Sequence, residues 1–124
     1  MAEDYARERK TERMTDIALG YKKSQTLLTA VDLGLFDAIS SGRNTLAAIS
    51  EGLDLEEEKV DRLLTACKAV ELIREVDGRY ENFSDVERYL VSSQRTYFGD
   101  YLTYIARRDY EAWADLTGNL TEPV

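Results

Sequence analysis

Apolar residues in the first third of the chain recur at helical spacing and predict one long helix that ends at a glycine. From Thr15 onward they form a face that is broader than a surface helix needs. Gly34 predicts the end of this helix, because glycine adopts the left-handed conformation at little cost. A short apolar turn follows over 35–39. The face comprises Ile17, Tyr21, Leu27, Leu28, Val31 and Leu33.

Two aspartates interrupt this apolar stretch. We interpret Asp32 as a solvent-facing residue and Asp37 as a local turn former, because both sit among apolar neighbours without a motif around them.

The middle of the chain predicts two further helices in close succession. Thr45 is placed to cap the first, which should end at Gly52. The second runs from 56 to about 70, and its inward face should be apolar. That face contains Val60, Leu63, Leu64, Cys67 and Val70 at core spacing.

A hairpin should follow these helices. The segments 72–76 and 79–83 flank Asp77-Gly78, a dipeptide that favours a two-residue hairpin turn. Helix, turn, helix and hairpin in this order are typical of the winged helix-turn-helix arrangement.

The last part of the chain predicts a short helix that Ser84 would cap and then a helical aromatic stripe. The stripe begins at Tyr97, and Trp113 extends it beyond Arg107 and Arg108. These arginines could contact an acidic ligand, but pairing with neighbouring acidic residues is the favoured interpretation. The fold class expected for the whole chain is mainly α, with one small β-hairpin.

The composition disfavours several kinds of partner and chemistry but does not identify a function. The chain has 124 residues and a net charge of −8, which disfavours nucleic acid and anionic membranes as partners. It has one cysteine and no histidine, so the commonest general base and metal ligand are missing. Without an apolar run of roughly 18 residues or a signal peptide, a cytoplasmic location is expected.

The second of the two middle helices bears directly on DNA binding. In a winged helix-turn-helix its first residues approach the phosphates. Over residues 50–61 this chain places six acidic residues against Lys59 alone, a net charge that repels a phosphate backbone. DNA binding is therefore an unfavoured interpretation.

Four stretches of this chain together resemble the dimerisation domain of S-adenosylmethionine-dependent small-molecule O-methyltransferases, the group with caffeate, acetylserotonin and polyketide enzymes. The resemblance covers about Thr15 to Gly118. The stretches are ALGYKKSQTLLTAVDLGLFDAI, TLAAISEGLDLEEEKVDRLLTACKAVELI, DGRYENFSDVERYLV and YLTYIARRDYEAWADL.

This resemblance implies a homodimer in which the extra N- and C-terminal helices form an intertwined layer. The alternative for the broad apolar face is local core. The resemblance also implies a pocket for a small aromatic or polyketide-like acceptor, and the alternative there is again core or interface. The expected dimer-interface residues are Ile17, Leu28, Val31, Leu33, Leu35 and Phe36. The expected acceptor-pocket residues are Tyr21, Tyr101, Tyr104, Ile105 and Trp113.

The cofactor half of such an enzyme has no counterpart in this sequence. No Gly-x-Gly follows a strand and no βαβ alternation occurs, so no catalytic, cofactor-binding or metal residue is assigned, and S-adenosylmethionine is implied only for a full-length enzyme.

We expect a charged arm over 1–13, the dimerisation domain over 14–118, and a tail or linker over 119–124. The chain is then the domain of a longer methyltransferase or a stand-alone relative that binds a small molecule or, less favoured, DNA as a regulator.

Overall fold

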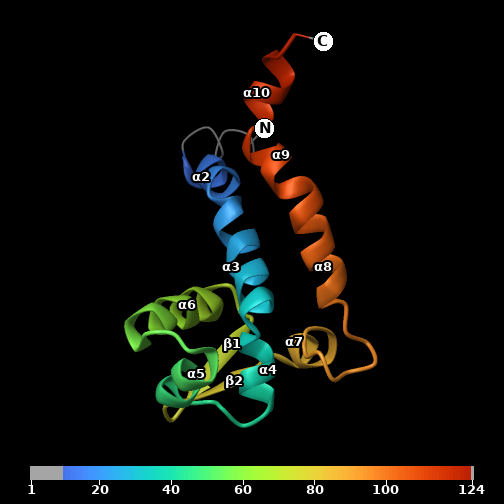
Figure 1. The fold of residues 1–124 in the computed structure, drawn as a ribbon. Helices are drawn as coiled ribbons and strands as arrows, with labels where there is room; N and C mark the ends of the chain where they lie inside the picture. The colour runs from blue at the N-terminus through green and yellow to red at the C-terminus, as the bar shows by residue number, and fades with distance from the viewer. Residues whose placement is uncertain (1–9, 124) are drawn as a thin grey trace.

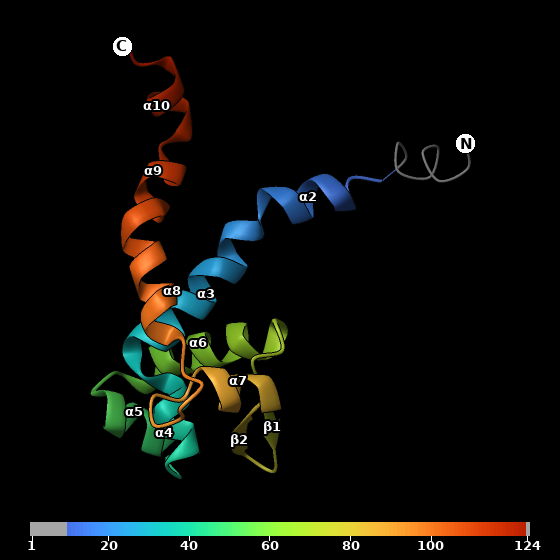
Figure 2. The ribbon, with the colours of Figure 1, turned by 90° about the vertical axis from the view of Figure 1, so that its right-hand side faces the viewer.

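Two helical arms rise from a body of short helices and one hairpin in the computed structural model, which describes residues 10–123 (Figure 1). The first arm joins α2 (Glu12–Ala18) to α3 (Gly20–Leu33). The second arm runs through α8 (Gly99–Ile105), the π-helix η1 (Ala106–Tyr110), α9 (Glu111–Ala114) and α10 (Leu116–Thr121). Figure 2 shows that the arms diverge from their base toward the two ends of the chain.

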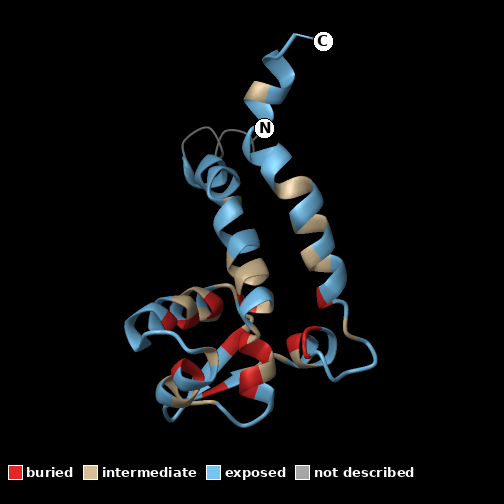
Figure 3. Ribbon diagram, in the orientation of Figure 1, coloured by how far each residue is buried: buried red, intermediate tan, exposed pale blue. Residues whose placement is uncertain are grey.

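The body between the arms contains the hydrophobic core. Its elements are α4 (Leu35–Ser40), α5 (Leu46–Leu53), α6 (Glu57–Ala69), β1 (Ile73–Val76), β2 (Arg79–Asn82) and α7 (Ser84–Tyr89). Figure 3 shows buried residues concentrated in the body and at the base of the arms, while the arms are largely exposed. The largest fully buried side chains are Phe36, Leu35, Ile49, Leu64, Ile73, Val60 and Cys67.

Local sequence signals account for some of the helix ends in the body. Gly34 adopts the left-handed conformation at φ 77° between α3 and α4, as predicted. Thr45 caps α5, and its hydroxyl accepts a hydrogen bond from the backbone N–H of Ala48 at 3.2 Å. The predicted end at Gly52 is wrong by one residue: α5 continues to Leu53, and Asp54 takes the left-handed conformation at φ 55°. Aspartate tolerates this conformation better than most residues.

The helix-turn-helix and the hairpin occur in the predicted order. Val60, Leu64 and Cys67 of α6 are buried, as their spacing predicted. Strands β1 and β2 pair antiparallel, with Val76 opposite Arg79, and Asp77 and Gly78 both have positive φ values of 52° and 76°. Two central residues of positive φ define a type I′ turn, whose twist matches that of the flanking strands.

One predicted helix boundary differs from the structure: Phe83 holds the extended cap position before α7, and Ser84 is the first helical residue. The division into an arm over 1–13, a domain over 14–118 and a tail over 119–124 stays a prediction; its two boundaries lie within α2 and α10. Residues 1–9 of the predicted arm lie outside the described part of the chain.

The interpretation of Asp37 as a local turn former also needs correction. Its carboxylate accepts hydrogen bonds from the backbone N–H of Ser92 at 2.7 Å and from the Ser92 hydroxyl at 2.8 Å. Asp37 therefore joins α4 to the loop after α7, whereas Asp32 is exposed, as expected.

Candidate functional site

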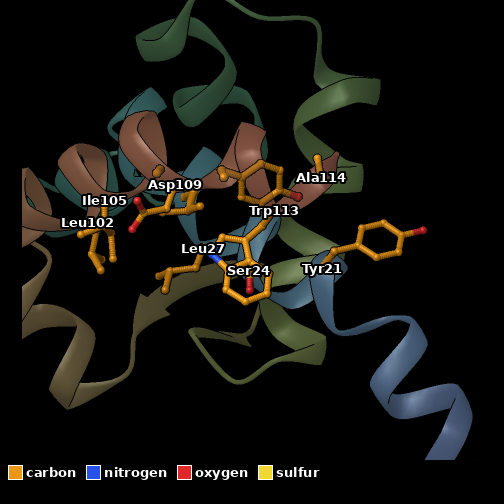
Figure 4. Close-up of a pocket in the computed structure, with 11 residues that line it drawn as sticks. Tyr21, Ser24, Leu27, Leu102, Ile105, Asp109, Trp113 and Ala114 are labelled. Atoms are coloured by element: carbon orange, nitrogen blue, oxygen red, sulfur yellow. The ribbon is translucent and has the colours of Figure 1, made fainter. Parts of the chain in front are cut away.

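A cleft of about 730 Å³ lies between α3 and the second arm (Figure 4). Its position follows from the fold, because the arms touch near the body and then diverge. Its walls are mainly apolar and aromatic. Helix α3 supplies Tyr21, Ser24, Leu27 and Leu28, and the second arm supplies Leu102, Ile105, Ala106, Asp109, Tyr110, Trp113 and Ala114.

Helical spacing on both arms directs these side chains into one cleft. Tyr21, Ser24 and Leu28 are separated by three and four residues, so they share one face of α3. On the second arm, the π-helical turn η1 contributes Asp109 and Tyr110 to the wall. Figure 4 shows Asp109 and Trp113 between the two helix ribbons, whereas the ring of Tyr21 points away at the edge.

Asp109 is the charged residue among those that line the cleft. Its carboxylate accepts hydrogen bonds from Nε of Arg108 at 2.8 Å and from Nη2 at 3.1 Å. These bonds to the guanidinium hold the pKa of Asp109 below its usual range, so the group stays ionised. The same contacts, together with Tyr104, raise the pKa of Arg108. The pair confirms the salt-bridge interpretation of Arg108.

A second hollow lies on the other side of the contact between the arms. It measures about 230 Å³ and shares Leu28, Ala106 and Tyr110 with the larger cleft. Arg107 and Asp32 line this smaller hollow and not the larger one. The two consecutive arginines therefore occupy different surfaces.

The structure brings three of the five predicted pocket residues together. Tyr21, Ile105 and Trp113 line the cleft. Tyr101 and Tyr104 do not, and their side chains are 59% and 57% exposed. Tyr101 directly precedes the cleft residue Leu102, and Tyr104 directly precedes the cleft residue Ile105. Consecutive residues of a helix lie on different faces, so both tyrosines face away from the cleft.

The predicted interface residues divide into three groups. Ile17 and Leu33 are exposed on the first arm, with Ile17 at 64%, while Leu28 and Val31 are partly buried. Leu35 and Phe36 are fully buried in the body of this chain, so they offer no surface to a partner. For these two residues the expectation is corrected: the short helix α4 belongs to the core, which was the alternative interpretation.

Sequence reasoning missed Asp109, Tyr110 and Ser24 as cleft residues. The resemblance pointed to mainly aromatic positions, and a count from Leu102 in steps of three and four would have added Asp109. This count holds through η1, because Asp109 and Trp113 both line the cleft.

The features of residues 10–123 do not support a metal site, a membrane-spanning helix, thiol chemistry or DNA binding. No cluster of three or more candidate metal ligands is present in this range, and none of its helices is long and apolar enough to cross a membrane. Burial raises the pKa of the Cys67 thiol to about 12, which suppresses the reactive thiolate. Glu56, Glu57 and Glu58 are exposed where α6 begins, on the surface that would have to meet DNA.

Comparison with known proteins identifies the family. The family model of the O-methyltransferase dimerisation domain matches residues 15–92. The chain belongs to this family. The dimerisation domain is 36% identical over 104 residues to 3-hydroxy-5-methyl-1-naphthoate 3-O-methyltransferase of Streptomyces sahachiroi, covering 84% of the chain and 30% of that enzyme.

Two further relatives place this dimerisation domain in a wider group of methyltransferases. It is 31% identical over 109 residues to the N,N-dimethyltransferase OxyT of Streptomyces rimosus, covering 88% of the chain and 32% of that protein. The crystal structure of human N-acetylserotonin methyltransferase in complex with SAM superimposes with a TM-score of 0.79 at 26% identity, covering 90% of the chain and 34% of that protein. The chain thus spans about a third of the length of these relatives.

Proposed function

We propose that this dimerisation domain forms the homodimer contact and the acceptor lid of a S-adenosylmethionine-dependent methyltransferase that acts on a small aromatic or polyketide-like molecule. The observation that carries the proposal is the large apolar surface of the two arms. Ten large apolar or aromatic side chains there are exposed in the single chain, a pattern typical of surfaces that bind a partner. They are Met14, Ile17, Leu19, Tyr21, Leu33, Tyr101, Tyr104, Trp113, Leu116 and Leu120.

The dimer part of the proposal rests on the first arm. Helix α2 contains no buried residue, although Met14 and Ile17 are large apolar side chains. A helix with little contact to its own domain is stable in water only if another surface covers its apolar side. A second copy of the chain is the partner that the family supports.

The lid part rests on the cleft. Its apolar walls carry a few polar groups at defined positions, which is typical of sites for small planar molecules. Relatives of this domain are named for a naphthoate and for acetylserotonin, both of which contain fused aromatic rings. The relatives include an N,N-dimethyltransferase as well as O-methyltransferases, so they do not share one type of methylated atom.

The residues described do not fit S-adenosylmethionine itself. The sheet in residues 10–123 is an antiparallel hairpin, and its tight turn links two strands instead of leading from a strand into a helix. A nucleotide-type cofactor needs that strand-turn-helix unit to bring backbone amides close to it. We therefore assign no step of methyl transfer to this chain and place the cofactor in a separate α/β domain of a longer protein.

Light scattering after size exclusion tests the dimer. The expected mass is twice the chain mass of 14.1 kDa down to nanomolar concentration. Ile17→Glu should yield the monomer, because it places a charge on the exposed apolar side of α2. Thr15→Glu adds the same charge to an exposed polar position of α2 and should leave the dimer intact. A monomeric wild-type chain would overturn the proposal.

A further inference from the structure

Asp109 is a distinctive feature of the cleft because it combines a stable charge with aromatic neighbours. The other polar groups in the wall are the hydroxyls of Ser24 and Tyr110 and the indole N–H of Trp113, since the ring of Tyr21 points away. None of these side chains is ordinarily charged at neutral pH. The cleft therefore presents one negative charge within a mainly apolar and aromatic surface.

The arrangement of Arg108 keeps this carboxylate available to a ligand. Arg108 contacts both carboxylate oxygens of Asp109, yet it does not line the cleft. Its guanidinium lies over the ring of Tyr104, 5.5 Å from the ring centre, and Tyr104 is outside the cleft as well. Each carboxylate oxygen can accept more than one hydrogen bond, so the oxygens keep acceptor capacity toward the cleft.

Positive charge is absent from the described wall of this cleft. The neighbouring Arg107 lines the smaller hollow on the other side of Leu28 and Ala106. An anionic ligand would thus meet the Asp109 carboxylate without a compensating cation in the wall. A cationic ligand would gain the carboxylate and the faces of the aromatic rings, which attract cations through their quadrupoles.

We infer that the cleft selects planar aromatic ligands that carry a protonated amine, and that Asp109 is the residue that sets this selection. The inference rests on the proposed function, since it specifies the chemistry of the acceptor that the lid would hold. Trp113 and Tyr110 supply the aromatic surface, and Leu27 and Leu102 supply apolar contact for the ring system.

The single tryptophan of the chain provides a direct test. In a ¹⁵N-labelled sample of the 124-residue chain, the indole N–H of Trp113 gives one cross-peak, which reports occupancy of the cleft. Three probes of similar shape would be titrated at neutral pH: naphthylmethylamine as the cation, naphthylmethanol as the neutral probe and naphthoate as the anion. The cation should bind roughly five- to tenfold more tightly than the neutral probe, and the anion more weakly than both.

Two variants separate the charge of Asp109 from the shape of the cleft. Asp109→Asn keeps the size of the side chain, and the preference for the cation should disappear while naphthylmethanol still binds. Arg108→Gln removes the competing cation outside the cleft, and the preference should persist or increase. The amide cross-peaks of the body show whether each variant is folded.

The outcomes distinguish this inference from the proposed function. Equal affinity for the three probes, or a preference that survives in Asp109→Asn, overturns the selection by Asp109 and leaves the aromatic cleft in place. If no probe moves the Trp113 cross-peak, both the selection and the acceptor-lid part of the proposed function fail. A loss of cation preference in Asp109→Asn alone supports the inference.

Discussion

At the scale of single residues, short polar contacts join parts of the chain that are far apart in sequence. Asp37 and Ser92 are 55 residues apart and are linked by two hydrogen bonds. Asn82 similarly donates to the carbonyl of Phe36 at 3.0 Å and to the carboxylate of Glu87 at 2.9 Å. These contacts fix α7 and the loop after it against α4.

Asp37→Ala should lower the free energy of unfolding by about 1–2 kcal/mol, because it removes two charge-assisted hydrogen bonds at a partly exposed position. Asp32→Ala is the matched control, since Asp32 is an exposed aspartate on α3. Its stability should stay within about 0.5 kcal/mol of the wild type. Urea unfolding followed by circular dichroism measures both, and equal stability of the two variants would contradict the assignment.

Cys67 allows a prediction of pH dependence. Burial raises the pKa of its thiol from 9.0 to about 12 in the folded chain, so the folded state keeps the proton longer than the unfolded state. The stabilising contribution is complete below about pH 9 and is lost as pH rises toward 12. Unfolding free energies of wild type and Cys67→Ala, compared over this range, should show the steeper fall in the wild type. A parallel fall in both would contradict the prediction.

At the scale of elements, the backbone conformation of a glycine decides whether it ends a helix. Gly34 separates α3 from α4 and has a positive φ of 77°, whereas Gly20 lies at the start of α3 in an ordinary conformation. No heavy atom lies within 4 Å of a Cβ built at either glycine, so backbone conformation alone distinguishes the two positions.

Gly34→Ala should therefore destabilise the chain by about 1–2 kcal/mol, the cost of a left-handed conformation for a residue with a Cβ. Gly20→Ala should be neutral or stabilising by up to about 1 kcal/mol, since alanine is the better helix former. Thermal unfolding of the two variants tests this contrast. If both variants were equally stable, the left-handed conformation of Gly34 would not be the constraint.

Helical spacing stays informative across the π-helix η1. Residues 106–110 form a wider turn, yet the cleft residues keep steps of three and four from Leu102 through Asp109 to Trp113. The aromatic stripe was predicted as one feature, but the structure divides it. Trp113 reaches the cleft, while Tyr101 and Tyr104 face outward.

At the scale of the whole molecule, the two arms carry apolar side chains that the body of the same chain does not cover. If a second copy covers them, folding and association are coupled, and stability depends on protein concentration. The unfolding midpoint of the wild type should rise with concentration over a hundredfold range, and that of Ile17→Glu should not. A constant midpoint for the wild type would show that dimerisation contributes nothing to its stability.

Charge at the same scale gives a prediction for DNA. With a net charge of −8 and an acidic start of α6, the chain should not shift duplex DNA at low micromolar concentration and low salt. An electrophoretic mobility assay measures this directly. A shift that weakens with added salt would contradict this prediction and favour the DNA-binding interpretation.

The sequence by itself determined the local elements, because their signals lie within a few residues of each other. Spacing identified the core face of α6, Asp77-Gly78 defined the hairpin turn, and Gly34 ended α3. Only the tertiary structure decided which apolar residues face the protein's own core. Leu35 and Phe36 are as apolar as Ile17, but they are buried against helices and strands distant in sequence.

The cleft shows the same division between sequence and tertiary structure. The resemblance to the methyltransferase family placed Tyr21, Ile105 and Trp113 among the candidates, yet the cleft exists because α3 and the second arm meet at one end and then diverge. That geometry depends on packing between segments about 80 residues apart, which one-dimensional spacing does not encode. For the same reason Asp109 gains its place beside the aromatic side chains only once the chain is folded.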